Sequence, residues 1–257
     1  MSGGSSWVTT VVVDSMQVYR EIPVITNQAR ARPAEMVSIV SIAEEWTVAR
    51  HKEWAEARIA SLPPDPPFVL DAGTGMYLNA LIFDIPLAPK VPPAVRAEAE
   101  ERARGAENPK REARKLELEL AGYSGRGSIW SGNLRYDANI VYLRPPREDL
   151  DRNIRTRSSK IVGEGGTEEA RRLLDSGIDP NSSVREAIGV KETLLYASGK
   201  LSGREAEETI AARTRQLARR QVRWFDKLVR SLPHDEASTT VVENAKDARS
   251  SVECMIQ

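Results

Sequence analysis

Two short segments of the sequence contain side chains that could take part in catalysis. The first is DSMQVYR at residues 14–20, in which Asp14 could act as a general base or hold a metal ion. The second is the turn GTG, in which the hydroxyl of Thr74 stands between two glycines that let the backbone approach an anion. Each segment also has a structural explanation, because an Asp often caps a helix and glycine is common in turns.

Both segments follow predicted strands. The β-branched run Trp7–Val13 predicts a buried strand that ends at Asp14, and residues 68–70 predict a second strand that ends before the GTG turn. A helix is predicted between them over residues 44–61. Its expected apolar face consists of Val48, Ala55, Ile59 and Leu62. Strands separated by helices indicate a parallel α/β sheet, which binds ligands at the carboxyl ends of its strands, so we expect Asp14 and Thr74 to share a site.

The rest of the chain is predicted to be mostly helical. Residues 92–121 are rich in helix formers and charges of both signs, which predicts an exposed helical hairpin broken near Gly105 and Pro109. A Gly-rich loop follows, and a third strand is predicted over residues 139–143. Helices are then expected as far as Leu232, with breaks at residues 163–166, 177–183 and 199.

Composition excludes several classes of protein. The 257 residues include 37 Lys and Arg against 37 Asp and Glu, so the formal net charge is zero. A single cysteine, Cys254, rules out an intramolecular disulfide, and two distant histidines, His51 and His234, make a His/Cys metal site improbable. No apolar run approaches the ~20 residues that span a bilayer, and the N-terminus does not resemble a signal peptide. We therefore expect a cytoplasmic protein without a membrane partner.

One predicted helix has a strong excess of positive charge. Residues 213–230 contain seven bases and one acid, Asp226, a difference of +6. The bases are Arg213, Arg215, Arg219, Arg220, Arg223, Lys227 and Arg230. The apolar positions expected to face the core are Ile210, Leu217, Phe225 and Leu228. A solvated face normally mixes charges of both signs, so this helix favours a polyanionic partner such as RNA, and Arg152, Arg155 and Arg157 add to the basic character.

Six motifs, in order along residues 11–230, resemble those of the tRNA dimethylallyltransferase (isopentenyl-tRNA transferase) family. They are DSMQVYR at 14–20, AGTGMY at 72–77, NPKREARKLE at 108–117, RPPR at 144–147 with Ile154 and Arg157 after it, AIGVKE at 187–192, and TRQLARRQ at 214–221 with Trp224 and Phe225 after it. One family feature is absent from the sequence, which contains no GxxxxGK[ST] phosphate loop.

The resemblance implies an α/β fold and a reaction. The fold would be a P-loop NTPase-like, nucleotide-binding parallel sheet whose first strand and phosphate loop are missing, with a helical insertion and a helical C-terminal part. The enzyme would transfer a dimethylallyl group from dimethylallyl diphosphate to the exocyclic amine of the tRNA adenosine adjacent to the anticodon, flipping that base out of its stack. Asp14 would accept the proton or hydrogen bond of the amine, Thr74 would bond near the reacting centre, and Arg157 would steady the diphosphate.

The resemblance also assigns binding residues. The flipped base would contact Asp14, Ser15, Met16 and Gln17, and the diphosphate would contact Gly73, Thr74, Gly75 and Arg157. The tRNA anticodon stem-loop would be held by Lys110, Arg111, Arg114, Arg215, Gln216, Arg219 and Arg220. Mg²⁺ would accompany the diphosphate, with its protein ligands on the missing loop and none among the residues present.

Four regions follow from these predictions. Residues 1–91 would form the N-terminal part of the α/β core, residues 92–133 a tRNA-binding helical hairpin, residues 134–232 the rest of the core with the basic helices, and residues 233–257 a polar, disordered tail. We expect a monomer. Two alternatives stay open. One is a non-catalytic, truncated RNA-binding relative, which the absence of a phosphate loop favours. The other is a prenyltransferase that acts on a free adenine nucleotide.

Overall fold

The computed structural model describes residues 8–64, 67–85, 87, 91–123, 129–130, 132–233 and 237–256. The chain forms two compact units, each described here by itself. The larger unit consists of Met1–Ile82 together with Leu134–Gln257, and the smaller consists of Phe83–Asn133. In the described ranges, no helix is both long enough and apolar enough to cross a lipid bilayer.

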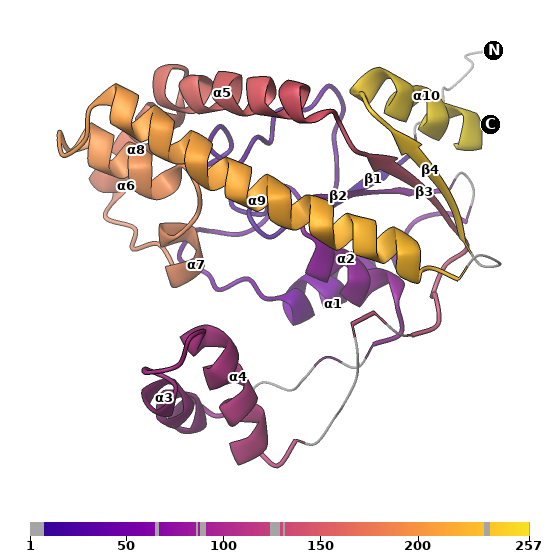
Figure 1. Ribbon diagram of the computed structural model, residues 1–257, viewed down its shortest axis with the longest axis horizontal. Helices are drawn as coiled ribbons and strands as arrows, with labels where there is room; N and C mark the ends of the chain where they lie inside the picture. The colour runs from indigo at the N-terminus through magenta and orange to yellow at the C-terminus, as the bar shows by residue number, and fades with distance from the viewer. Residues whose placement is uncertain are drawn as a thin grey trace. The chain divides into compact units, whose positions relative to one another are not determined.

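The strands of the larger unit form two separate parallel pairs (Figure 1). Strand β1 (Thr10–Val13) pairs with β2 (Val69–Ala72), and β3 (Ala138–Leu143) pairs with β4 (Ala237–Val242). The predicted α/β class and the parallel direction are confirmed. In the described ranges, however, β2 and β3 each have a hydrogen-bonded neighbour strand on one edge only.

Helices surround these two pairs in the larger unit. Their bounds are α1 (Val48–Ala60), α2 (Gly75–Ile82), α5 (Arg147–Gly163), α6 (Gly166–Ser176), α7 (Ser182–Arg185), α8 (Val190–Ala197), α9 (Gly203–Ser231) and α10 (Ala245–Ile256). The longest, α9, begins at a capping box in which Ser202 and Glu205 bond to each other's backbone N–H groups. It runs across the unit beside α5, and the ion pair between Arg215 and Asp151 joins these two helices (Figure 1).

The core of the larger unit lies around β1. Val11 and Val13 are fully buried together with Tyr19, Leu81 and Ile210, as expected for a β-branched central strand. The predicted apolar face is confirmed, because Val48, Ala55 and Ile59 of α1 and Leu62 just after it all pack in or against this core. On α9 one predicted core position is wrong: Leu217 is 37% exposed, and Ala218 is buried beside it instead.

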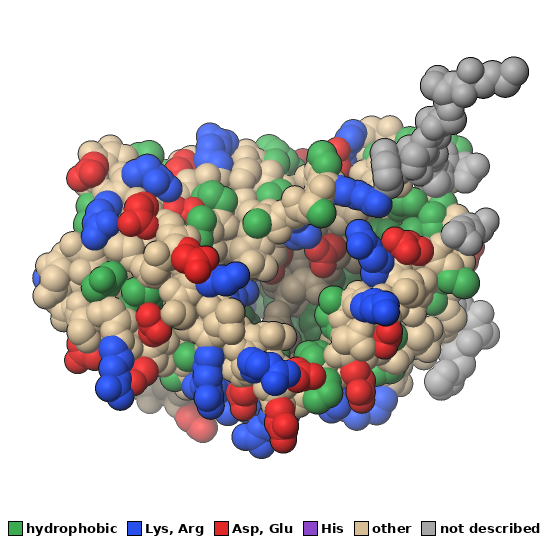
Figure 2. Space-filling model, turned by 90° about the horizontal axis from the view of Figure 1, so that it is seen from above, with side chains coloured by type: hydrophobic (Ala, Val, Ile, Leu, Met, Phe, Trp, Pro, Cys, Tyr) green, Lys and Arg blue, Asp and Glu red, His purple; other side chains and the backbone are tan. Residues whose placement is uncertain are grey.

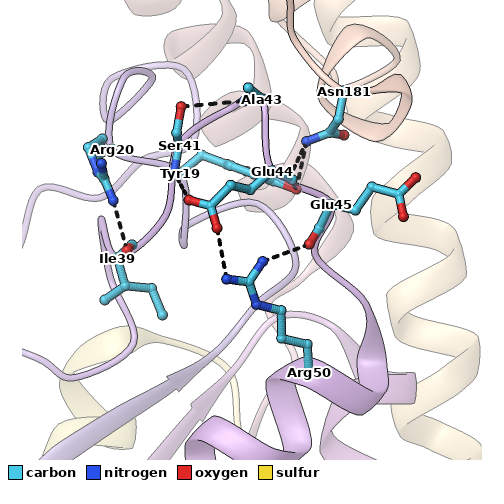
Figure 3. A network of polar contacts seen from close by, with 9 residues as sticks. All are labelled: Tyr19, Arg20, Ile39, Ser41, Ala43, Glu44, Glu45, Arg50 and Asn181. Atoms are coloured by element: carbon cyan, nitrogen blue, oxygen red, sulfur yellow. Dashed lines mark hydrogen bonds and ion pairs between the residues drawn. The ribbon is translucent and has the colours of Figure 1, made fainter.

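A polar network fixes the segment that follows the DSMQVYR motif (Figure 3). The side-chain amide of Asn181 donates to the hydroxyl of Tyr19 at 3.1 Å and to the carbonyl oxygens of Ile42 and Glu44 at 2.8 and 2.7 Å. Arg50 of α1 bonds to the Glu44 carboxylate at 2.8 Å. One side chain at the start of α7 therefore holds a loop that lies about 140 positions earlier in the chain.

The smaller unit contains the predicted helical hairpin. Helix α3 (Pro93–Arg102) and helix α4 (Pro109–Leu120) are separated by a turn that contains Gly105, so the expected break is confirmed. Each helix begins with a proline, and the Asn108 side chain caps α4 by accepting from the N–H of Arg111 at 3.2 Å. The unit begins at Phe83 rather than at residue 92.

The prediction of a disordered tail over residues 233–257 is wrong for the residues that the structure describes. Strand β4 pairs with β3 along its whole length, from Ala138 opposite Ala237 to Leu143 opposite Val242. Helix α10 follows β4 directly. The open edge of β3 supplies the hydrogen-bonding partner that makes this polar segment a strand.

Candidate active site

Asp14 and Thr74 meet where β1 and β2 end. One carboxylate oxygen of Asp14, Oδ1, accepts from the backbone N–H groups of Met16 and Gln17 at 2.7 and 3.1 Å. The other oxygen, Oδ2, lies 3.3 Å from the hydroxyl of Thr74, which also accepts from the N–H of Ser15 at 3.1 Å. The structure therefore brings Asp14 and Thr74 together as expected, and Oδ2 is the oxygen of Asp14 that accepts no backbone hydrogen bond in the described ranges.

The glycines of the GTG turn are needed for close approach. A Cβ atom on Gly73 would lie 2.7 Å from Oδ2 of Asp14, and one on Gly75 would overlap the indole ring of Trp224. Gln221 of α9 donates to the carbonyl oxygen of Gly73 at 2.7 Å, so α9 holds the turn in place. The predictions for the site did not include Gln221 or Trp224, although both stand in or beside the matched motif TRQLARRQ.

Arg157 of α5 forms no hydrogen bond with Asp14 or Thr74 in the described part of the chain and instead contacts the loop near residue 25. Its guanidinium donates to the carbonyl oxygen of Ile25 at 3.2 Å, and it lines a cavity of about 730 Å³ between α5 and the loops near residues 23–29 and 37–38. Desolvation by burial lowers the pKa of Arg157 from its ordinary value, and the negative charge of Asp14 opposes that shift. Arg157 and Asp14 are thus linked by this electrostatic effect on the pKa and by no hydrogen bond or ion pair in the described ranges.

Arg30 orients Gln17, which is one of the predicted base contacts. Its two terminal nitrogens donate to the side-chain oxygen of Gln17 and to the Asp71 carboxylate, each at 2.6 Å. No local sequence signal predicts this arrangement, because the three residues lie on different segments and Arg30 belongs to no matched motif. Asp71, placed in β2 just before the GTG turn, thus has an ion-pair partner.

Comparison with known proteins decides the family. The family model for IPP transferase matches residues 17–123 and 105–228. This chain belongs to the IPP transferase family. It is 58% identical to a tRNA dimethylallyltransferase of Rubrobacter xylanophilus over 229 residues, which cover 88% of this chain and 78% of the relative. It is 29% identical to a tRNA dimethylallyltransferase of Deinococcus radiodurans, with 84% of this chain and 80% of that relative covered.

Solved structures of the IPP transferase family share the fold. A full-length tRNA isopentenylpyrophosphate transferase from Bacillus halodurans matches with a TM-score of 0.67 and 24% identity, covering 96% of this chain and 87% of that one. A eukaryotic dimethylallyltransferase, described as acting on tRNA, matches with a TM-score of 0.72 and 19% identity, covering 96% and 71%. The α/β fold of this chain is therefore that of tRNA isopentenyltransferase structures.

The predicted tRNA contacts of α9, together with the neighbouring Arg213, fall into two groups. Arg213 and Arg215 form ion pairs with Glu192 and Asp151, so they join α9 to its neighbouring helices. Gln216, Arg219 and Arg220 are exposed, and no hydrogen bond or ion pair ties their side chains to the described part of the chain. Arg215 therefore joins α9 to α5, while Gln216, Arg219 and Arg220 are exposed, and tRNA contact by these four residues stays a prediction.

The predicted tRNA contacts of the hairpin lie in the smaller unit. Arg111 is exposed, and Arg114 forms an ion pair with Glu117 at 2.6 Å. The side chain of Lys110 lies outside what the structure describes. All three positions are on α4.

The described residues do not offer a ready protein site for Mg²⁺. They contain no group of three or more His, Cys, Asp or Glu side chains that could hold a metal ion. At the candidate site Asp14 is the carboxylate beside Thr74, and its oxygens already accept three hydrogen bonds. Mg²⁺ commonly keeps several waters and binds through substrate phosphates with one or two carboxylates.

Proposed function

We propose that this chain transfers a dimethylallyl group from dimethylallyl diphosphate to the exocyclic amine of the tRNA adenosine adjacent to the anticodon. The observation that carries the proposal is the contact of Asp14 with Thr74 at the ends of β1 and β2, in a member of the IPP transferase family. The 58% identity to a tRNA dimethylallyltransferase supports the same substrate class.

The proposed chemistry is a substitution at the allylic carbon. A bond forms between the adenine nitrogen and that carbon, the bond from the carbon to the diphosphate oxygen breaks, and the amine loses a proton. Asp14 accepts this proton or its hydrogen bond through Oδ2, because Oδ1 is held by two backbone N–H groups. Thr74 orients Oδ2, and Arg157 stabilises the negative charge that develops on the diphosphate.

The flipped adenine would lie against the segment Ser15–Gln17. Gln17 is the best candidate for an edge contact, because Arg30 already fixes its side chain at 2.6 Å. The exposed side chains Gln216, Arg219 and Arg220 of α9 would contact phosphates of the stem-loop, and the α4 residues Lys110, Arg111 and Arg114 would add contacts from the insertion. Enzymes that modify a base generally need it outside the stack.

We propose further that the two parallel strand pairs are parts of one P-loop NTPase-like sheet. The two separate pairs support this, because each described strand has only one neighbour strand, so each pair has edges open to a further strand. We propose that Mg²⁺ arrives with the diphosphate rather than in a protein cage, that the chain acts as a monomer, and that it works in the cytoplasm, where its tRNA substrate would be.

The decisive experiment compares the wild-type chain with Asp14→Asn. Labelled dimethylallyl diphosphate is mixed with an anticodon stem-loop, and transfer and RNA affinity are both measured. Asn can still accept the capping bonds at Oδ1, so folding and RNA affinity should stay unchanged while kcat falls about 10²- to 10⁴-fold. Equal loss of affinity and turnover would show that Asp14 is a structural residue.

The same assay separates the two alternatives. A non-catalytic RNA-binding relative would bind the stem-loop and transfer nothing, and the absence of a phosphate loop from the sequence is the observation that favours it. A prenyltransferase for free adenine nucleotides would modify adenosine monophosphate faster than the stem-loop. Preference for the stem-loop would support the proposed function over both.

A further inference from the structure

A second positive side chain shares the cavity with Arg157. Lys160 lies three residues further along α5, so the two side chains project from the same face of the helix, and both line the cavity of about 730 Å³. That volume is in the range of small-molecule sites. The sequence analysis did not single out Lys160, which belongs to no matched motif.

Neither cation is neutralised by a carboxylate within ion-pair distance in the described part of the chain. Glu164 lines the same cavity one turn after Lys160, yet the two form no ion pair. The same spacing does produce a pair elsewhere, since Lys52 lies 3.7 Å from Glu56 on α1. The cavity wall therefore has two cations against one carboxylate, and Lys160 remains available to an anion.

The wall opposite these cations is held in place. The carboxylate of Glu169, which is fully buried, accepts from the N–H groups of Val24 and Ile25 at 2.7 and 3.0 Å. The carbonyl of the same Ile25 accepts from Arg157. Gly189, with a φ of 97°, leaves room for this loop, because a Cβ there would lie 2.9 Å from the Ile25 side chain. The cavity is therefore largely preformed.

The composition of the wall suits a ligand with an anionic end and an apolar end. Val24, Val37 and Ile161 provide apolar surface, while Arg157 and Lys160 provide charge. An alkyl diphosphate has both properties. Ser38 also lines the cavity, but its hydroxyl already donates to the side-chain oxygen of Gln28 at 2.5 Å, so the two cations are the donors that we assign to the anionic end.

We infer that Lys160 is a second diphosphate-binding residue, which acts with Arg157 to hold the anionic end of the prenyl donor in this cavity. The inference rests on the proposed function for the identity of the donor, but the anion site itself can be tested without any transfer. Lys160 would contact a phosphoryl oxygen of the bound donor and would help to stabilise the leaving diphosphate.

The test uses inorganic pyrophosphate as the probe and calorimetric titration of the full chain. Lys160→Gln should weaken pyrophosphate binding about tenfold, Lys160→Arg should restore most of it, and Arg157→Gln should also weaken it. Lys200→Gln is the matched control, because Lys200 is exposed and lies outside the cavity. In transfer assays, Lys160→Gln should raise KM for dimethylallyl diphosphate and leave KM for the stem-loop unchanged.

The outcomes distinguish this inference from the proposed function. If pyrophosphate binding falls in Lys160→Gln although no variant transfers a prenyl group, the anion site stands and the proposed reaction fails. If the chain transfers the group and Lys160→Gln matches Lys200→Gln in both binding and KM, the inference is overturned and the reaction stands. Failure of the wild-type chain to bind pyrophosphate would also overturn the inference. Thermal melting of each variant excludes loss of fold as the cause.

Discussion

The DSMQVYR motif divides into two halves with different roles. Asp14 and Gln17 are partly exposed at the ends of the first strand pair, where they can meet a ligand. Val18 and Tyr19 are fully buried, and Tyr19 bonds to Asn181 in the network of Figure 3. The buried half therefore fixes the backbone from which the first half projects.

His51 gives a prediction at the scale of one residue. It is fully buried, its Nδ1 accepts from the indole N–H of Trp46 at 3.2 Å, and its Nε2 has no hydrogen-bond partner among the described residues. Burial lowers the pKa of His51 from 6.5 to about 4. The unfolded chain therefore binds a proton more readily, and the free energy of unfolding should fall by roughly 1.4 kcal/mol per pH unit as pH drops from about 6.5 to about 4.

Denaturant unfolding across this pH range measures the effect. His51→Gln keeps an acceptor for Trp46 but does not titrate in this range, so the slope of stability against pH should be smaller in the variant by the amount that His51 contributes. Parallel curves for the wild type and the variant would contradict the prediction. Other acidic groups contribute equally to both proteins and cancel in the difference.

Asn181 connects the residue scale to the element scale. Its side chain caps α7 through the N–H groups of Ser183 and Val184, and it bonds to the loop before α1. Asn181→Ala should lower the free energy of unfolding by about 3 kcal/mol, because it removes a cap and leaves two carbonyl oxygens without this donor. Ser183→Ala, an exposed change in the same helix, should have little effect. Equal stabilities of the two variants would refute this role.

The exposed arginines of α9 give a second prediction for an element. If Arg219 and Arg220 bind phosphates, the double change to Gln should weaken stem-loop binding and reduce the slope of log K against log salt by about 1.5. Arg204→Gln is the matched control, since Arg204 is on the same helix, is highly exposed and pairs with Glu208. A salt slope identical to that of the control would rule out phosphate contacts by these two residues.

The elements show where sequence reasoning succeeds and where it fails. Helices α3 to α6, α8 and α9 and strands β1 to β3 follow from local periodicity, prolines and glycines, and the breaks near residues 163–166 and 199 fall as predicted. Helix α7 begins inside the predicted break at 177–183, and the break at residues 186–189 was not predicted. Strand β4 does not follow from these local features, because Thr239 and Thr240 lie in a polar tail, and the partner that makes them a strand is β3, about a hundred residues earlier. Arg30 was missed at the site for the same reason, because its partners Gln17 and Asp71 are distant in sequence.

At the scale of the whole molecule, the two separate strand pairs and the cavity lined by Arg157 and Lys160 both bear on which residues would contact the diphosphate. The proposed P-loop architecture places a strand between the two parallel pairs, and the sequence contains no phosphate loop to supply diphosphate contacts. Arg157 and Lys160 offer an alternative set of contacts on α5. Two hypotheses follow for the proposed diphosphate site: it needs contacts from a phosphate loop, or the α5 cations suffice for it.

A fusion protein separates these two possibilities. It carries a strand, a phosphate loop and a helix of the family type ahead of β1. If the site is incomplete, the fused strand should pair with the open edges of β2 and β3, raise the melting temperature by several degrees, and increase prenyl transfer at least tenfold. A fused unit whose loop Lys is changed to Ala should raise the melting temperature without increasing transfer, because the strand remains and the phosphate contact is lost. If the unmodified chain already transfers the group as fast as the fusion, the α5 cations suffice, and Arg157 and Lys160 become the residues on which catalysis depends.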